Sequence, residues 1–253
     1  MILITEVFLT EIGDIMIKIE NLRKTFATKV AVDDLTLDVP SGKVYGFLGP
    51  NGAGKTTTIK MIIGMLRQDQ GKIEIDGSDT LENPLESKKK FAYVPDNPDI
   101  YDTMTARQYL NFMADVFSIT LEKRNENIKK YAEIFEMTDN LDATISTLSH
   151  GMKQKIVLIG ALIHEPKLLI LDEPMVGLDA KSSFRLKNIM RDVADTGGTV
   201  FFSTHVMEVA EKMCDEIAII NKGKLIAEGS LDEIRAAAKD SGSLEKIFLE
   251  LTE

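Results

Sequence analysis

The sequence predicts an α/β fold with a mainly parallel central sheet, an N-terminal antiparallel β portion and a helical insert. Three observations lead to this prediction. A glycine-rich loop at residues 49–56 lies between an apolar run typical of a strand and a run with apolar residues at helical spacing. Residues from about 105 to 163 are helical in pattern throughout. Beyond them, short apolar strands alternate with helices, which favours a parallel sheet covered on both faces.

Composition limits the classes of protein to consider. The 253 residues can bury a large core, and 40 acidic against 30 basic residues leave a formal charge of −10. That balance argues against a nucleic-acid partner. One cysteine, Cys214, rules out an internal disulfide and fits a reducing compartment. No run approaches the roughly 20 apolar residues that cross a bilayer, so we expect no direct membrane insertion.

The first 15 residues are interpreted as an extension. They lack the basic start and the cleavage site of a secretory signal. They are either an added edge strand or a segment upstream of a translation start at Met16. The remaining residues, 16–253, are predicted to form a single domain.

Two alternating segments, 17–19 and 35–39, predict antiparallel strands that lead into the loop strand at 43–48. Phe26 lies between them. An aromatic residue in this position usually packs in a core or on an edge, although it could also stack on an adenine ring.

The loop itself, Gly49–Thr56, fits the pattern G-x-x-x-x-G-K-[ST] and is followed by a predicted helix at 57–66. Its backbone N–H groups and the helix N-terminus would hold a polyphosphate. Lys55 would reach the β- and γ-phosphates, and the Thr56 hydroxyl would bind Mg²⁺. The predicted nucleotide-binding residues of this segment are Asn51, Gly52, Ala53, Gly54, Lys55, Thr56 and Thr57.

After the loop helix, strands are predicted at 72–77 and 91–94, and prolines 95 and 98 end the second one. A helical insert at about 97–163 follows. Its helices present apolar faces, one formed by Tyr109, Phe112, Met113 and Val116, the other by Ile128, Tyr131, Ala132, Ile134 and Phe135.

Sheet strands return at 167–172, 199–204 and 216–220, with helices at about 180–194 and 206–213 between them. Short helices at about 231–239 and 244–251 close the chain.

Polar residues at the carboxyl ends of these strands are candidates for chemistry, because ligands of open parallel sheets bind there. Asp172 could hold Mg²⁺ beside Thr56. Glu173 could orient and deprotonate a water, and His205 could contact the γ-phosphate. Ser149 is a predicted N-cap, and with Gly151 beside it this helix start is another anion site.

The ordered set of motifs resembles the nucleotide-binding subunit of ABC transporters, a P-loop NTPase, over nearly the whole chain from Met16. Gly49–Thr57 resembles the Walker A loop, Leu148–Met152 the signature loop and Leu168–Glu173 the Walker B strand with its catalytic glutamate. Gly177-Leu178-Asp179 resembles the D-loop and His205 the switch histidine. Phe26 falls where the adenine-stacking aromatic is expected.

Two positions depart from the family's pattern. Asp96 stands where the family usually has a Gln that touches Mg²⁺ and the water, so the resemblance adds Asp96 to the metal ligands. In the signature loop, His150 and Met152 replace the usual Gly and Gln. The exporter-type branch can look like this, and the residues 244–251 resemble that branch's tail.

The resemblance implies an ATPase that uses ATP and Mg²⁺ and powers a separate multi-span permease, with export the expected direction. It implies a homodimer or heterodimer with ATP between Walker A of one copy and the signature loop of the other, and a cytoplasmic location on the inner face of the membrane. Two alternatives remain open: a non-transport ABC ATPase, and a regulatory subunit that hydrolyses poorly.

Overall fold

The computed structural model describes residues 14–238 and 243–252. The prediction for residues 1–13 of the extension lies outside the described residues. The first strand, β1 (Ile15–Phe26), begins one residue before Met16, and the Met16 side chain is buried.

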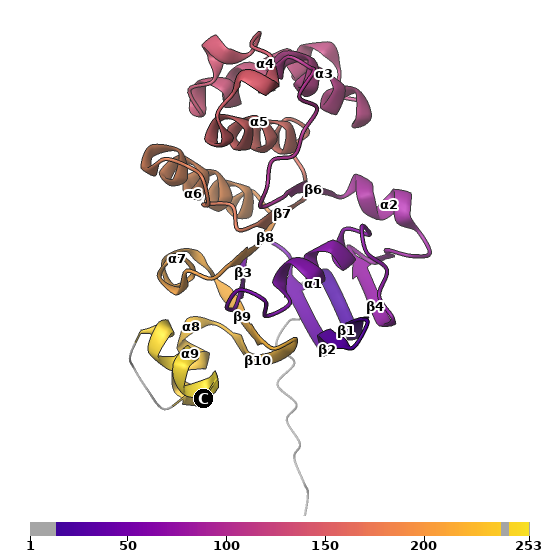
Figure 1. The fold of residues 1–253 in the computed structure, drawn as a ribbon, viewed down its shortest axis with the longest axis vertical. Coiled ribbons are helices and arrows are strands. Elements are labelled where there is room, and N and C mark those ends of the chain that lie inside the picture. The colour runs from indigo at the N-terminus through magenta and orange to yellow at the C-terminus, as the bar shows by residue number, and fades with distance from the viewer. Residues whose placement is uncertain (1–13, 239–242, 253) are drawn as a thin grey trace, which may run out of the picture.

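The central sheet has six strands in the order β10-β9-β3-β8-β7-β6 (Figure 1). All neighbours are parallel except β10, which runs antiparallel to β9. The strands β3 and β7 consist entirely of buried residues, as expected of a sheet with both faces covered. The bounds are β3 (Val44–Leu48), β6 (Phe91–Val94), β7 (Leu168–Asp172), β8 (Thr199–Thr204), β9 (Glu216–Asn221) and β10 (Lys224–Gly229).

A second, antiparallel sheet has the order β2-β1-β4-β5. The bounds of its other strands are β2 (Lys29–Pro40), β4 (Gln70–Ile75) and β5 (Ser78–Asp79). The strands β1 and β2 are longer than predicted, because register shifts interrupt the alternation that marks their middle. This is the predicted N-terminal antiparallel portion, completed by β4.

Helix α1 (Lys55–Ile62) packs between the two sheets, in one hydrophobic cluster with Ile17 of β1 and Phe201 of β8. It ends four residues before the predicted position. Gly64 has a φ of +70°, a left-handed conformation that stops the helix.

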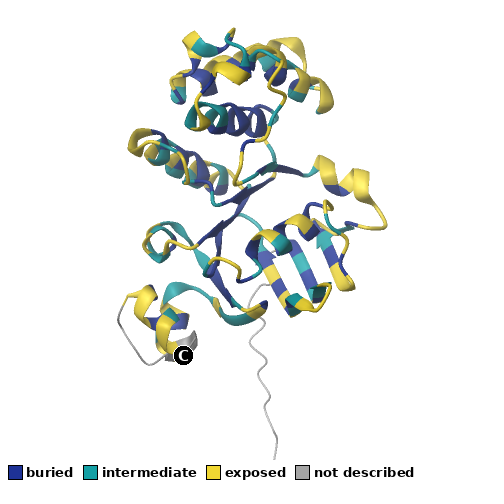
Figure 2. Ribbon diagram, viewed as in Figure 1, coloured by how far each residue is buried: buried dark blue, intermediate teal, exposed yellow. Residues whose placement is uncertain are grey.

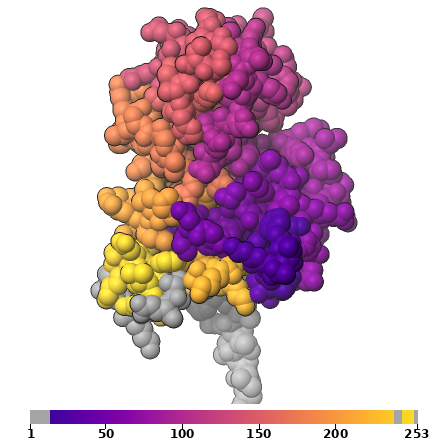
Figure 3. Space-filling view, viewed as in Figure 1, coloured from indigo at the N-terminus to yellow at the C-terminus, as the bar shows by residue number. Residues whose placement is uncertain are grey.

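The helices of the insert lie together at one end of the molecule, apart from the antiparallel sheet (Figures 1 and 3). They follow β6 and precede β7. Their bounds, with two short 3₁₀ turns, are α3 (Ala106–Val116), α4 (Leu121–Ile134), η1 (Thr138–Asn140), η2 (Ile145–Thr147) and α5 (His150–Leu162). Helix α2 (Pro84–Lys89) comes just before β6 and is not part of the insert.

The predicted apolar face of α3 is only partly buried. Tyr109 lies in the core, but Phe112 and Val116 are exposed, and the buried face is completed by Leu110 and Ala114 instead. On α4 the prediction holds better, since Ile128, Tyr131, Ala132 and Phe135 are buried. Figure 2 shows the difference between the buried α5 and the more exposed α3 and α4.

Four further helices cover the rest of the central sheet, at the positions predicted from the sequence. They are α6 (Ala180–Asp195), α7 (Met207–Met213), α8 (Leu231–Ala238) and α9 (Leu244–Thr252). Within residues 14–238 and 243–252, no helix has the length and apolarity needed to cross a membrane.

Candidate nucleotide site

The phosphate-binding loop is held in place by both sheets. Gly223, in the turn between β9 and β10, donates its N–H to the Ala53 carbonyl at 2.8 Å. Gly54 has a φ of +115°, and a Cβ there would stand 2.6 Å from the Ala31 carbonyl oxygen of β2. Only glycine adopts this φ readily and leaves room for the Ala31 carbonyl. Gly54, the second glycine of the pattern, is therefore required by packing as well as by the turn.

Lys55 opens α1 and turns back over the loop. Its Nζ donates to the carbonyl oxygens of Gly49 and Pro50 at 2.7 and 3.3 Å, and lies 3.1 Å from Oε1 of Glu173. The side chain is almost fully buried. An ammonium group in such a place is stabilised by these acceptors.

Glu173 lies between two cationic or donor groups. Its Oε1 faces Lys55, and its Oε2 is 3.0 Å from Nδ1 of His205, which follows β8. The structure therefore brings together the three predicted catalytic residues, Lys55, Glu173 and His205, from α1, the end of β7 and the end of β8. A carboxylate held this way can position a water and accept its proton.

Asp172 is the last residue of β7 and is fully buried. Burial raises the pKa of its carboxyl, the neighbouring hydroxyls of Ser203 and Thr56 oppose that effect, and the charges of Asp96 and Glu173 add to it. Its Oδ2 has no hydrogen-bond partner among the described residues. A buried carboxylate oxygen left over in this way, beside a threonine hydroxyl, fits the oxygen ligands that Mg²⁺ prefers.

Asp96 follows β6 and is exposed. It is near enough for its charge to raise the pKa of both Asp172 and Tyr93, although burial is the larger cause for each. The loop that carries it is fastened to α5, since Gln154 donates from Nε2 to the Pro95 carbonyl at 3.4 Å. The sequence did not point to this role of Gln154.

Phe26 ends β1 and has 48% of its surface exposed, so it does not pack in a core; of the packing alternatives only an edge position remains beside stacking on an adenine ring. Lys24 Nζ lies 5.6 Å from the ring centroid. The exposed ring can offer a face to a planar base.

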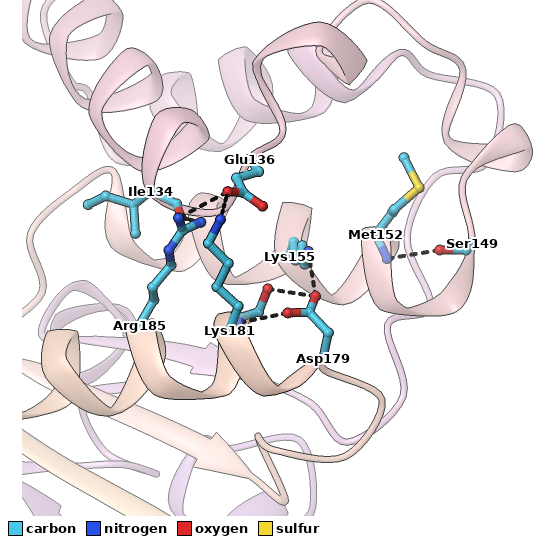
Figure 4. Close-up of polar contacts among 9 residues, drawn as sticks. Ile134, Glu136, Ser149, Met152, Lys155, Asp179, Lys181 and Arg185 are labelled. Atoms are coloured by element: carbon cyan, nitrogen blue, oxygen red, sulfur yellow. Dashed lines mark hydrogen bonds and ion pairs between the residues drawn. The ribbon is translucent and has the colours of Figure 1, made fainter.

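The predicted signature-loop residues are not part of this cluster. Ser149 caps α5, accepting a hydrogen bond from the Met152 N–H at 3.3 Å (Figure 4). Gly151 lies against the D-loop of its own chain, where a Cβ would stand 2.7 Å from the Gly177 carbonyl oxygen. The His150 ring packs on Gly177 as well. The start of α5 therefore packs against the D-loop rather than against the phosphate loop.

Ion pairs fasten the insert to α6, which begins directly after the D-loop (Figure 4). Lys155 of α5 lies 2.8 Å from Asp179, the N-cap of α6. Glu136 pairs with Lys181 and Arg185, and Arg185 also donates to the Ile134 carbonyl. These contacts join α5 and the end of α4 to the first two turns of α6.

Taken together, a phosphate loop, a carboxylate pair and a histidine at the carboxyl edge of a parallel sheet define a nucleotide-binding protein of the P-loop class. The comparisons with known proteins then identify its family. Residues 32–176 match the model of the ABC transporter family, and the chain belongs to that family. It is thus an ATP-binding subunit of the ABC ATPases.

Individual relatives agree with this assignment. The chain is 36% identical over 222 residues to the linearmycin resistance ATP-binding protein LnrL of Bacillus subtilis, covering 87% of this chain and 70% of LnrL. It is 34% identical to the Nod factor export ATP-binding protein I of Burkholderia lata, over 85% of this chain and 70% of that protein. A solved ATP-binding subunit of an ABC transporter superimposes with a TM-score of 0.90 at 31% identity, over 94% of this chain and all of the other.

Proposed function

We propose that this chain hydrolyses ATP to power a separate membrane permease, and that the transport is export. The observation that carries the proposal is the placement of Glu173, whose two carboxylate oxygens lie 3.1 Å from Lys55 Nζ and 3.0 Å from His205 Nδ1. Export as the direction is supported by likeness to relatives, one of which is named for Nod factor export.

The Lys55–Glu173 pair suggests how nucleotide prepares the base. Lys55 pairs with Glu173 and with loop carbonyls. A polyphosphate in the loop would compete for the ammonium group. Glu173 would then be free to take the proton of a water held with His205, while that water's oxygen bonds to the γ-phosphorus and the bond to the leaving ADP oxygen breaks.

Three residues would hold Mg²⁺: Thr56 through its hydroxyl, Asp172 through its free Oδ2, and Asp96. When bound there, the ion would supply positive charge that offsets the negative charge developing on the phosphates. Because Asp172 is buried and its pKa is raised mainly by burial, a cation beside it would also relieve the cost of its charge.

A second copy would complete the site. Gly151 lies on the D-loop of its own chain. We propose that the N-terminus of α5, with Ser149 and Gly151, meets the ATP of another subunit, in a homodimer or a heterodimer. Two such contacts related by a two-fold axis close the assembly. ATP would close the dimer and hydrolysis would open it.

Exposed apolar side chains support a further protein partner. Tyr101 and Phe112 form an edge-to-face pair with ring centroids 5.9 Å apart, and both are exposed, as is Val116. Tyr101 lies five residues after Asp96, in the segment that leads to α3. We propose that the permease docks here, which would keep the subunit on the inner face of the membrane.

The Glu173→Gln variant tests the proposed function. It removes the base and keeps the size of the side chain, so ATP binding is retained while steady-state hydrolysis falls on the order of 100-fold or more. The closed dimer should accumulate with Mg-ATP, as measured by light scattering. Glu126→Gln, which removes an exposed carboxylate on α4, is the matched control and should behave as wild type. A Glu173→Gln protein with normal turnover would rule out the proposed role.

A further inference from the structure

Ser203 lies on β8, two residues before His205, and is fully buried. We propose that its hydroxyl is a positioning group for the hydrolytic site, one that sets both the free oxygen of Asp172 and the backbone of Glu173. The proposal rests on the proposed function of Glu173 as base and adds to it the residue that holds that base.

The hydroxyl uses its hydrogen-bonding capacity on these two neighbours. It donates to Oδ1 of Asp172 at 2.5 Å and accepts from the Glu173 N–H at 3.0 Å. A serine hydroxyl has a single hydrogen to donate, and here it is committed to one carboxylate oxygen. That choice leaves Oδ2 of Asp172 as the oxygen available to a cation.

The second bond holds an unusual backbone conformation. Glu173 has a φ of +47°, in the left-handed region that is unfavourable for residues with a side chain. Its N–H is bound by Ser203, and its carbonyl accepts from the Val176 N–H at 3.1 Å. The turn thus stabilised is what takes Glu173 out of the line of β7, where its carboxylate reaches Lys55 and His205.

One hydroxyl therefore links the carboxylate of Asp172 to the backbone of Glu173. Ser203 and Asp172 are paired across β8 and β7, so the hydroxyl is fixed by the sheet itself. Groups of this kind orient metal ligands, and their loss typically lowers metal affinity or activity by about 10- to 100-fold.

The test is Ser203→Ala, studied beside Ser203→Thr, which keeps an oxygen on the same carbon. For Ser203→Ala we expect kcat to fall about 10- to 100-fold with little change in KM. The Mg²⁺ concentration that half-saturates fluorescent ATP binding should rise about 10-fold, a readout that needs no turnover. Binding of the same nucleotide without Mg²⁺ should stay unchanged, and Ser203→Thr should restore most of both losses.

Thr199→Val is the matched control. Thr199 has a buried hydroxyl group on the same strand, at the opposite end from Ser203. This hydroxyl accepts a hydrogen bond from the Gly42 N–H at 3.0 Å. Its removal should lower stability and leave kcat and the Mg²⁺ dependence as in wild type.

Two results would overturn the proposal. One is a Ser203→Ala protein with wild-type kcat and Mg²⁺ dependence, and the other is an equal loss in Thr199→Val, which would reveal a merely structural effect. Failure of the proposed function is recognised separately, because there the wild type would not hydrolyse ATP or Glu173→Gln would remain active.

Discussion

At the scale of single residues, the site depends on groups whose surroundings are less favourable than those of ordinary core residues. Glu173 adopts a left-handed backbone, the carboxyl group of Asp172 is fully buried, and Lys55 is nearly enclosed. Each is compensated by a specific neighbour. Substitution of these three residues should lower ATP hydrolysis more than it lowers the free energy of unfolding. Substitution of buried polar residues outside the site should mainly lower the free energy of unfolding.

Asp96 offers a test of this kind. A carboxylate reaches less far than the glutamine usual in the family, and its charge adds to that of Asp172. We therefore expect nucleotide binding to depend more steeply on Mg²⁺ in wild type than in Asp96→Gln, and the variant to remain an active ATPase. Titration of Mg²⁺ against ATP affinity measures this. Overlapping curves would place Asp96 outside the metal's coordination, and Asp99→Asn controls for the loss of a charge on the same loop.

His164 is the second residue-scale test. It follows α5 and stacks on Phe117 with ring centroids 3.6 Å apart. Burial lowers its pKa to about 4. Between pH 6.5 and 4 the unfolded chain therefore binds a proton that the folded chain does not, so stability falls as the pH falls through this window.

Replacing His164 by Phe keeps a ring on Phe117 and removes the proton. On going from pH 7 to pH 5, wild type should lose about 2 kcal/mol more of its free energy of unfolding than the variant does. Urea titrations at the two pH values measure the difference. Equal losses in the two proteins would show that His164 takes up its proton in the folded state.

At the scale of elements, the ion pairs of α6 decide how the insert is attached to the body. Asp179 accepts hydrogen bonds from the Ser182 N–H and hydroxyl, each at 2.8 Å, and pairs with Lys155. The Lys155 hydrogen bond, with the two from Ser182, holds the pKa of Asp179 well below its usual range. The lowered pKa favours the charged carboxylate that caps α6 and pairs with Lys155.

Two substitutions separate the cap from the ion pair. Asp179→Ala loses both and should destabilise the protein by about 1 kcal/mol, mostly through the cap. Asp179→Asn keeps a capping oxygen and should stay within about 0.5 kcal/mol of wild type, because the half-exposed Asp179 carboxylate leaves its pair with Lys155 screened by solvent. Thermal unfolding at pH 7 ranks the three proteins. If the Asn variant proved as unstable as the Ala variant, the ion pair would be the larger contribution.

The sequence predicted most elements because their signals are local. A buried strand such as β7 is an unbroken apolar run, and an N-cap such as Ser149 is a single residue with a defined chemistry. It did not predict α2 and β5, which are short and largely polar, or β10, none of whose residues is fully buried. These elements pair or pack with β6, β4 and β9, respectively, and such neighbours are not visible in the local sequence.

For the candidate site, the sequence predicted the main residues but not all of the contacts that hold them. The family-like positions of Lys55, Asp172, Glu173 and His205 could be read from the order of motifs, and the structure brings them together. The Lys55–Glu173 pair, the Ser203 bridge and the Gln154 contact could not be predicted, because they join residues 30 to 118 positions apart whose types alone do not identify a partner. Exposure of Phe112 and Val116 was missed because periodicity cannot distinguish a core face from a partner face.

At the scale of the whole molecule, the insert shares its core with the body. Leu110 of α3 belongs to one cluster with Val44 and Val200 of the central sheet. We therefore expect the insert to unfold together with the sheet.

Leu110→Ala tests this expectation. The substitution should cost about 2–5 kcal/mol, because the side chain is fully buried, and it should lower the protection of amides in β3 and β8 as much as those of α3 in hydrogen exchange. Val116→Ala, an exposed site on the same helix, should stay within about 0.5 kcal/mol of wild type. Loss of protection confined to the insert would mean that it unfolds on its own.

The contact between the phosphate loop and Gly223 has a consequence for how the protein is made. The loop is complete by residue 56, but the turn that supports it, and the strands β8 and β9 on either side of β3, come from the last quarter of the chain. Synthesis proceeds from the N-terminus, so a ribosome-bound chain that stops before β9 carries the whole phosphate-binding sequence without its support. We expect such nascent chains to be unable to hold ATP, so that the subunit can acquire its nucleotide only after β9 and the turn at Gly223 have been made.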